Sequence, residues 1–136
     1  MGEDKELERI KARMIERLMR SREESLLVSG SVVELDSSNF EEALRNSSLP
    51  LLVDFWASWC APCTVMKPVV EQLARDYAGR VSFAKVDVDR NQDLARRFGI
   101  MGIPSFILFR NGRPVDRVVG AVGRAGLETV LRRHLG

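Results

Sequence analysis

The seven-residue run LLVDFWA, residues 51–57, constrains the fold more than any other stretch of the sequence. An almost continuous apolar run of strand length is typical of a central strand that is buried on both faces. A short turn follows, and then the tetrapeptide CAPC, residues 60–63. Pro62 suits the first turn of a helix, where its missing N–H group leaves no hydrogen bond unmade. We therefore expect a buried strand that leads through the two cysteines into a helix over 62–78, which Gly79 ends.

From residue 31 onward, strand and helix patterns alternate. The expected strands are residues 31–35, 51–57, 81–88, 105–110 and 113–120, and the expected helices are residues 38–46, 62–78, 91–98 and 124–135. Ser38 followed by Glu41 predicts a capping box at the start of the first of these helices. The dipeptide Asn111-Gly112 is a strong hairpin signal, so the strands on either side of it are expected to pair antiparallel. The alternation predicts an α/β fold in which helices flank a central mixed β-sheet.

The first thirty residues follow a different pattern. Between Glu3 and Met19 the apolar residues recur at steps of three and four, which places them on one face of a helix. Residues 20–30 lose this pattern and are expected to form a linker. We therefore divide the chain into an N-terminal amphipathic helix with its linker, residues 1–30, and a domain, residues 31–136. The extra helix is expected either to dock on its own domain or fray in part, or to contact a second copy or a partner. Binding to a membrane surface is the less favoured alternative, because the segment has no net positive charge.

Charge and hydropathy exclude several classes of function. The formal net charge is +2 with the signs interspersed, so nucleic acid is not an expected partner. The apolar runs are far shorter than the ~20 residues that a membrane span needs. The charged N-terminus lacks the apolar core of a signal peptide. We expect a cytoplasmic monomer that does not bind membranes.

The two cysteines, Cys60 and Cys63, allow three interpretations. At a helix N-terminus, free N–H groups and the helix dipole favour an anion, so Cys60 is expected to favour its nucleophilic thiolate form. Side chains at i and i+3 of a helix are neighbours, so a small adjustment would close a disulfide with Cys63. This favours a redox-active pair. The alternatives are a zinc site, for which only His134 could add a third Cys or His ligand, and two cysteines that simply pack as small apolar residues.

Four motifs of the chain resemble those of the thioredoxin family. They are VDFWASWCAPC at 53–63, KP at 67–68, GIPS at 102–105 and VGA at 119–121, in the family's order and spacing from about residue 31 to residue 135. The resemblance implies a thioredoxin fold and a thiol–disulfide oxidoreductase, a protein-disulfide reductase with a part in electron transport and redox homeostasis. It implies that Cys60 is the exposed nucleophile and Cys63 the buried resolving thiol. No bound cofactor or metal is expected, since the dithiol carries both electrons.

Asp54 and Lys85 are the expected proton-transfer residues. A carboxyl inside a buried strand must be paired, hydrated or protonated with a raised pKa, or else satisfied structurally. The resemblance implies that Asp54 handles the proton of Cys63 and that Lys85 neighbours it; the alternative for Lys85 is a solvated strand lysine.

A substrate-binding rim around the cysteines is also implied by the resemblance. It includes a cis peptide bond before Pro104, a backbone at Ile103 that can pair with an extended substrate segment, and a Gly120 that leaves room for it. The full set is Trp59, Ala61, Pro62, Ile103, Pro104, Val119, Gly120 and Ala121. Expected partners are disulfide-containing client proteins and an electron donor of the thioredoxin-reductase type. The alternative function is a redox-inactive binding or scaffold module that uses the same rim. The family's commonest dipeptide between the cysteines is Gly-Pro, and Ala61-Pro62 adds one methyl group, so a reducing potential is expected.

Overall fold

The sheet of this protein has five strands in the order β1-β3-β2-β4-β5. The computed structural model describes residues 2–28 and 30–135, and within the first helix it describes the side chains of residues 5–19 only. The strands are β1 (Val32–Leu35), β2 (Leu51–Trp56), β3 (Ser82–Asp87), β4 (Ser105–Arg110) and β5 (Arg113–Val119). β1 and β2 run parallel to β3, whereas β4 runs antiparallel to both β2 and β5. The predicted mixed sheet, the central position of residues 51–57 and the hairpin at 111–112 are therefore confirmed.

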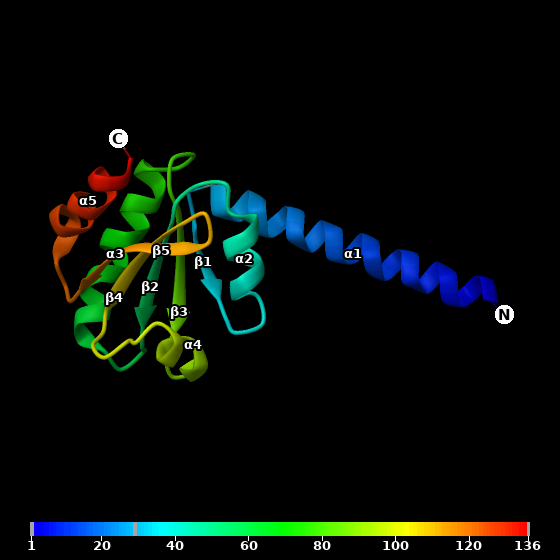
Figure 1. The fold of residues 1–136 in the computed structure, drawn as a ribbon, viewed down its shortest axis with the longest axis horizontal. Coiled ribbons are helices and arrows are strands. Elements are labelled where there is room, and N and C mark those ends of the chain that lie inside the picture. The colour runs from blue at the N-terminus through cyan, green and yellow to red at the C-terminus, as the bar shows by residue number, and fades with distance from the viewer. Residues whose placement is uncertain (1, 29, 136) are drawn as a thin grey trace.

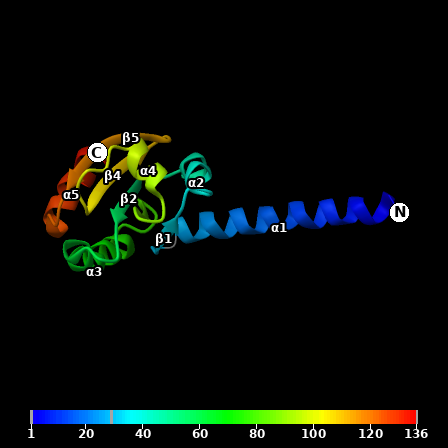
Figure 2. The same ribbon diagram turned by 90° about the horizontal axis from the view of Figure 1, so that it is seen from below.

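Helices cover both faces of the sheet, which gives three layers (Figures 1 and 2). The helices of the domain are α2 (Phe40–Asn46), α3 (Ala61–Asp76), α4 (Gln92–Arg97) and α5 (Gly123–His134). One core cluster joins α2 and α4 to the sheet, and another joins α3 and α5 to the opposite face. Because side chains alternate along a strand, Val53 and Phe55 enter the first cluster and Leu52 enters the second. The same alternation directs Asp54 toward the α3 side of the sheet.

The capping box predicted for the helix over 38–46 is wrong. α2 begins at Phe40 with Asn39 as its N-cap, and no side chain caps it. The Ser38 hydroxyl, which was expected to cap the helix, donates to Asp36 instead. The Asp36 carboxylate accepts hydrogen bonds from the N–H and the Oγ–H of Ser38, at 2.8 and 2.5 Å. An Asx turn of this kind satisfies the N–H groups of Ser38 and Asn39 before the helix begins.

The N-terminal helix, α1, extends from Gly2 to Val28. It thus continues through most of the segment that was expected to be a linker. The side chains of residues 5–19 are all exposed, so the expectation that this amphipathic helix docks on its own domain is wrong for them. Figures 1 and 2 show α1 extending away from the three layers, with only its last turns near β1 and α2. No helix in the described part of the chain is long and apolar enough to cross a membrane.

Candidate functional site

The two cysteines lie where β2 passes into α3, at the carboxyl end of the central strand. β2 ends at Trp56, and Cys60 is the N-cap of α3. Cys60 and Cys63 form a disulfide with their Cα atoms 5.3 Å apart, within the usual range for such bonds. Pro62 occupies the first turn of α3, as the sequence predicted. The closed ring therefore spans the first turn of a helix.

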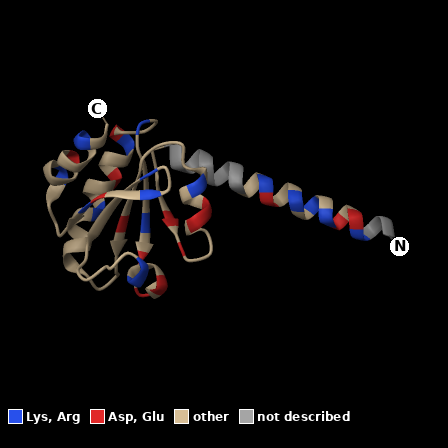
Figure 3. Ribbon diagram, in the orientation of Figure 1, with Lys and Arg blue, Asp and Glu red and all other residues tan. Residues whose placement is uncertain are grey.

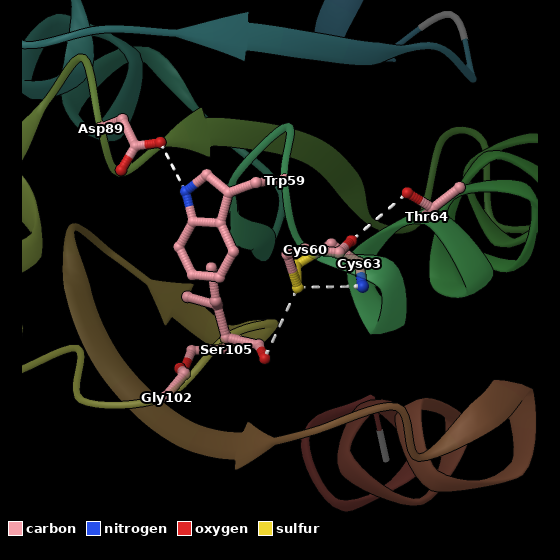
Figure 4. The surroundings of a disulfide bond; sticks show 8 residues. Trp59, Cys60, Cys63, Thr64, Asp89, Gly102 and Ser105 are labelled. Carbon is pink, nitrogen blue, oxygen red and sulfur yellow. Dashed lines mark hydrogen bonds between the residues drawn. A yellow bond between two sulfur atoms is a disulfide. The ribbon is translucent and has the colours of Figure 1, made fainter.

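The Cys60 sulfur occupies the position of a helix-capping acceptor. The backbone N–H of Cys63 donates to it at 3.2 Å (Figure 4). The carbonyl oxygen of Cys60 is held in turn by the backbone N–H of Thr64 at 3.2 Å and by its hydroxyl at 3.3 Å. This arrangement points an N–H group and the positive end of the α3 dipole at one sulfur atom. When the bond is reduced, the same group is in place to stabilise a thiolate on Cys60.

Exposure does not distinguish the two cysteines in the disulfide form. Each is 4% exposed, so the expectation of an exposed Cys60 and a buried Cys63 is wrong for Cys60 in this state. The bond turns the two sulfurs toward each other, and Ala57, Trp56 and Ile103 pack around them. What distinguishes the cysteines is their surroundings, because the Cys60 sulfur contacts the Ile103 carbonyl in the loop before β4, whereas Cys63 lines a cavity with Asp54 and Lys85.

That loop brings the second half of the predicted rim to the cysteines. The Ile103–Pro104 peptide bond is cis, as the resemblance implies. The carbonyl oxygen of Ile103 lies 3.8 Å from the Cys60 sulfur. The Ser105 hydroxyl donates to the Gly102 carbonyl, and the Gly120 N–H donates to the Pro104 carbonyl at 2.8 Å. These bonds hold the Ile103 backbone beside the reactive sulfur.

Gly120 has a backbone reason to be glycine. Its φ is +103°, a conformation that side chains disfavour, and an added Cβ would meet nothing within 4 Å. The free protein therefore has room at this position, and the expected clearance for a bound substrate stays a prediction.

The exposed part of the rim surrounds this opening. Trp59 is 69% exposed, and Ala61, Pro62, Val119 and Ala121 are exposed as well. Two contributors were missed in the sequence. Met101 is 97% exposed at the tip of the loop that carries Ile103, and Asp89 accepts a hydrogen bond from the Trp59 indole N–H at 2.8 Å (Figure 4). The position of Met101 one residue before the GIPS motif was the signal that could have identified it; Asp89 offered none, because it lies thirty residues from Trp59.

Asp54 and Lys85 lie side by side behind the cysteines. They are paired in register across β2 and β3, and both face α3. A cavity of about 240 Å³ is lined by both of them together with Cys63, Trp56 and Lys67. The Lys85 ammonium lies 5.3 Å from the centre of the Trp56 ring. The lining of this cavity includes Asp54 and Cys63 but not Cys60.

Burial dominates the electrostatics of Asp54. The side chain is 7% exposed, and Oδ1 makes no hydrogen bond with any described residue. Burial raises its pKa from 3.8 to about 7, and the positive charge of Lys85 opposes this only in part. A carboxyl with a pKa near neutrality can both accept and release a proton at the pH of the cell. Lys67, which lines this cavity and a second one of about 460 Å³ beside it, was not predicted.

The zinc alternative gains no support from the site. Among the side chains that the structure describes, no cluster of three or more His, Cys, Asp or Glu residues could hold a metal ion. His134 lies at the end of α5, where its Nε2 is 3.1 Å from Asp116 Oδ2.

Comparison with known proteins gives a consistent result. The thioredoxin family model matches residues 31–133. A thioredoxin from Staphylococcus haemolyticus is 45% identical over 105 residues, which are 77% of this chain and 99% of that protein. Thioredoxin 1 from Nostoc sp. is 40% identical over 105 residues, 77% of this chain and 98% of that protein. A bifunctional thioredoxin reductase/thioredoxin from Mycobacterium leprae is 43% identical over 99 residues, 73% of this chain and 22% of that protein. The family match begins after α1.

Proposed function

The chain belongs to the thioredoxin family and is a thiol–disulfide oxidoreductase, and on this premise we propose that Cys60 is the nucleophile and Cys63 the resolving thiol in the reduction of client protein disulfides. The observation that carries this assignment is the N-cap position of Cys60, with the Cys63 N–H directed at its sulfur at 3.2 Å. The same donor would stabilise the Cys60 thiolate that attacks the client disulfide.

The reaction has two exchange steps that together move two electrons. The Cys60 thiolate attacks one sulfur of the client disulfide, which forms a Cys60–client bond and releases the other client sulfur as a thiolate. The Cys63 thiolate then attacks Cys60, which forms the Cys60–Cys63 disulfide and releases the second client thiolate. The client is reduced, the protein is oxidised, and each client thiolate takes up one proton. No step needs a bound cofactor, because the two sulfurs hold both electrons.

Asp54 is proposed to accept the proton of Cys63 before the second step. Support comes from the shared cavity of about 240 Å³ and from the pKa of about 7 that burial gives this carboxyl. Lys85 is a positioning residue in this proposal, since its charge holds the pKa of Asp54 below the value that burial alone would give. Proton transfer of this kind is most effective when the pKa of the base is near the working pH.

The client is proposed to bind as an extended segment along the loop before β4. The rim residues on either side of the cysteines are apolar and exposed, and the Ile103 backbone is beside the Cys60 sulfur. Main-chain pairing at Ile103 would allow many sequences to bind, because backbone groups are common to all of them. This supports a general reductase over one with a single client.

The electron donor is proposed to be of the thioredoxin-reductase type, and the compartment to be the cytoplasm. A relative in which the two activities share one chain, the bifunctional protein of Mycobacterium leprae, supports the donor. The chain has one cysteine pair, which is proposed to cycle between dithiol and disulfide, and this use of cysteine is typical of a reducing compartment. The division into residues 1–30 and 31–136 is retained as a proposal.

Disulfide reduction in a test protein, with dithiothreitol as the final reductant, tests the assignment. The full chain should accelerate the reaction strongly, and Cys60→Ser should leave only the uncatalysed rate. Cys63→Ser should still attack and then stop at the mixed disulfide, which mass spectrometry detects as one client attached at Cys60. Equal rates for wild type and Cys60→Ser would reject the enzyme and leave the scaffold interpretation.

A further inference from the structure

The apolar stripe of α1 is exposed along its whole described length. The six side chains Leu7, Ile10, Met14, Ile15, Leu18 and Met19 are between 47% and 68% exposed. A helix that extends into solvent is marginal by itself, because most helical stability comes from packing of the amphipathic face. A continuous exposed apolar stripe of this kind marks an interaction site. We propose that a second copy of this chain covers it, with the two α1 helices paired antiparallel.

The stripe is self-complementary in the antiparallel direction. If a two-fold axis passes between residues 12 and 13, Leu7 of one chain lies opposite the partner subunit's Leu18. Ile10 then lies at the same level along the pair as the partner subunit's Ile15 but on the other flank of the seam, so large apolar side chains occupy both flanks. Lys11 and Glu8 are charged residues within the stripe, and a charged residue in a helical seam restricts register and partner number at some cost in stability.

The charges of the segment favour the same direction. The sequence has four acids and one base in residues 3–8, a net charge of 1 − 4 = −3, and three arginines without an acid in residues 17–22, a net charge of +3. With the axis given above, residues 3–8 of each chain lie opposite residues 17–22 of the other. A parallel pair would place like charge against like charge. Figure 3 shows acidic and basic residues interspersed along the described part of α1, so the contrast in net charge lies between the two end segments of the sequence.

Glu6 and Arg17 give this complementarity a specific pair. Eleven residues separate them, which is about three turns, so both lie on the same flank of the stripe. Equivalent flanks of two antiparallel helices face each other across the axis. Glu6 of each chain therefore faces the partner subunit's Arg17, and the contact occurs twice in the dimer.

The fold leaves room for this pairing. α1 joins the domain at the start of β1, whereas Cys60 follows the carboxyl end of β2. Because both strands run parallel to β3, the end of α1 and the cysteine pair lie at opposite ends of the sheet (Figure 1). In the dimer, residue 5 of one chain lies opposite residue 20 of the other. The partner's domain begins near residue 30, about 15 Å further along the helix axis at 1.5 Å per residue. The two domains therefore do not collide, and both redox sites stay open.

Sedimentation of the full chain from about 1 µM to about 200 µM tests the proposal. This range is chosen because four turns of helix make a small interface, whose dissociation constant is expected to be micromolar. Wild type should shift from monomer to dimer. Leu18→Glu should raise the dissociation constant at least about tenfold, while Val115→Glu, an exposed apolar position on β5, should leave it unchanged. Disulfide reduction by Leu18→Glu should equal that of wild type per chain, which shows that the domain is intact.

Charge reversal separates this pairing from nonspecific apolar contact. Glu6→Arg and Arg17→Glu should each weaken the dimer, and an equimolar mixture of the two variants should recover it, because both cross-chain pairs are then opposite in charge. Small-angle X-ray scattering of the dimer should show two domains at opposite ends of the paired helices. A monomer at every concentration, two domains on the same side, or binding of wild type to phosphatidylcholine–phosphatidylglycerol vesicles without self-association would each overturn the proposal.

Discussion

Replacing Asp54 by asparagine should stabilise the protein, and the gain should depend on pH. The carboxyl is buried, its Oδ1 has no hydrogen-bond partner among the described residues, and burial raises its pKa to about 7. Asparagine has nearly the same shape and carries no charge. The substitution therefore removes the cost of holding an ionised carboxylate in an apolar layer.

The size of the gain follows from the difference between the folded and unfolded pKa values. From 3.8 to about 7 is roughly three pH units, or about 4 kcal/mol at about 1.4 kcal/mol per unit. The folded protein keeps this proton to a higher pH than the unfolded chain. The contribution of Asp54 to the free energy of unfolding therefore falls between about pH 4 and about pH 7 and is level above that. The buried asparagine amide offsets part of the gain, so about 2–4 kcal/mol is expected at pH 8 and almost none at pH 4.

Urea unfolding of wild type and Asp54→Asn at several pH values between about 4 and 8.5 measures this difference. Asp116→Asn is the matched control. Burial raises the pKa of Asp116, but hydrogen bonds from the Arg117 N–H, His134 and Arg133 outweigh it and lower the pKa overall. That carboxylate contributes stability at neutral pH that is lost as the pH falls, so its variant should be destabilised at pH 7 and the difference should shrink in acid. A difference for Asp54→Asn that is constant across pH, or a loss of stability at pH 8, would refute the reasoning.

Three further substitutions test the core and the rim. Phe40→Ala should lower the free energy of unfolding by about 3–5 kcal/mol. The side chain is fully buried, and its ring centre lies 5.4 Å from that of Phe98 and 5.7 Å from that of Phe109. A loss below about 1 kcal/mol in urea unfolding would contradict the packing described for α2. Trp59→Ala should change stability little, because the ring is mostly exposed, yet raise KM for a client protein. Asp89→Asn, which keeps the ring but weakens its hydrogen bond, should show a smaller change, and an unaltered KM in Trp59→Ala would remove this ring from the client site.

The strands and the helices of the domain could be predicted because local patterns determine them. Residues 51–57 are apolar apart from Asp54 because β2 has a neighbouring strand on each side and a helix layer on each face. The strand over residues 105–110 was predicted at the observed bounds. Asn111 is the one non-glycine residue with a positive φ in the described part of the chain, which is what a hairpin turn of this kind requires. The positions of Cys60 and Pro62 at the start of α3 follow from the same local rules.

Contacts between distant segments could not be predicted in this way. The pairing of Trp59 with Asp89, and of His134 with Asp116, depends on loops and helix ends that meet only in the folded chain. The length of α1 was underestimated because residues 20–28 lack an apolar period, although helix can continue where no residue breaks it. The low exposure of Cys60 is that of the disulfide form, and the sequence does not specify the oxidation state.

The reactivity of Cys60 toward an alkylating reagent tests the central claim most directly. In the reduced protein at about pH 7, the capping N–H of Cys63 and the α3 dipole should hold Cys60 as a thiolate and make it react with iodoacetamide at least about ten times faster than free cysteine. Mass spectrometry of peptides identifies the modified sulfur, and Cys63 should react far more slowly. A Cys60 that reacts no faster than free cysteine would contradict the account.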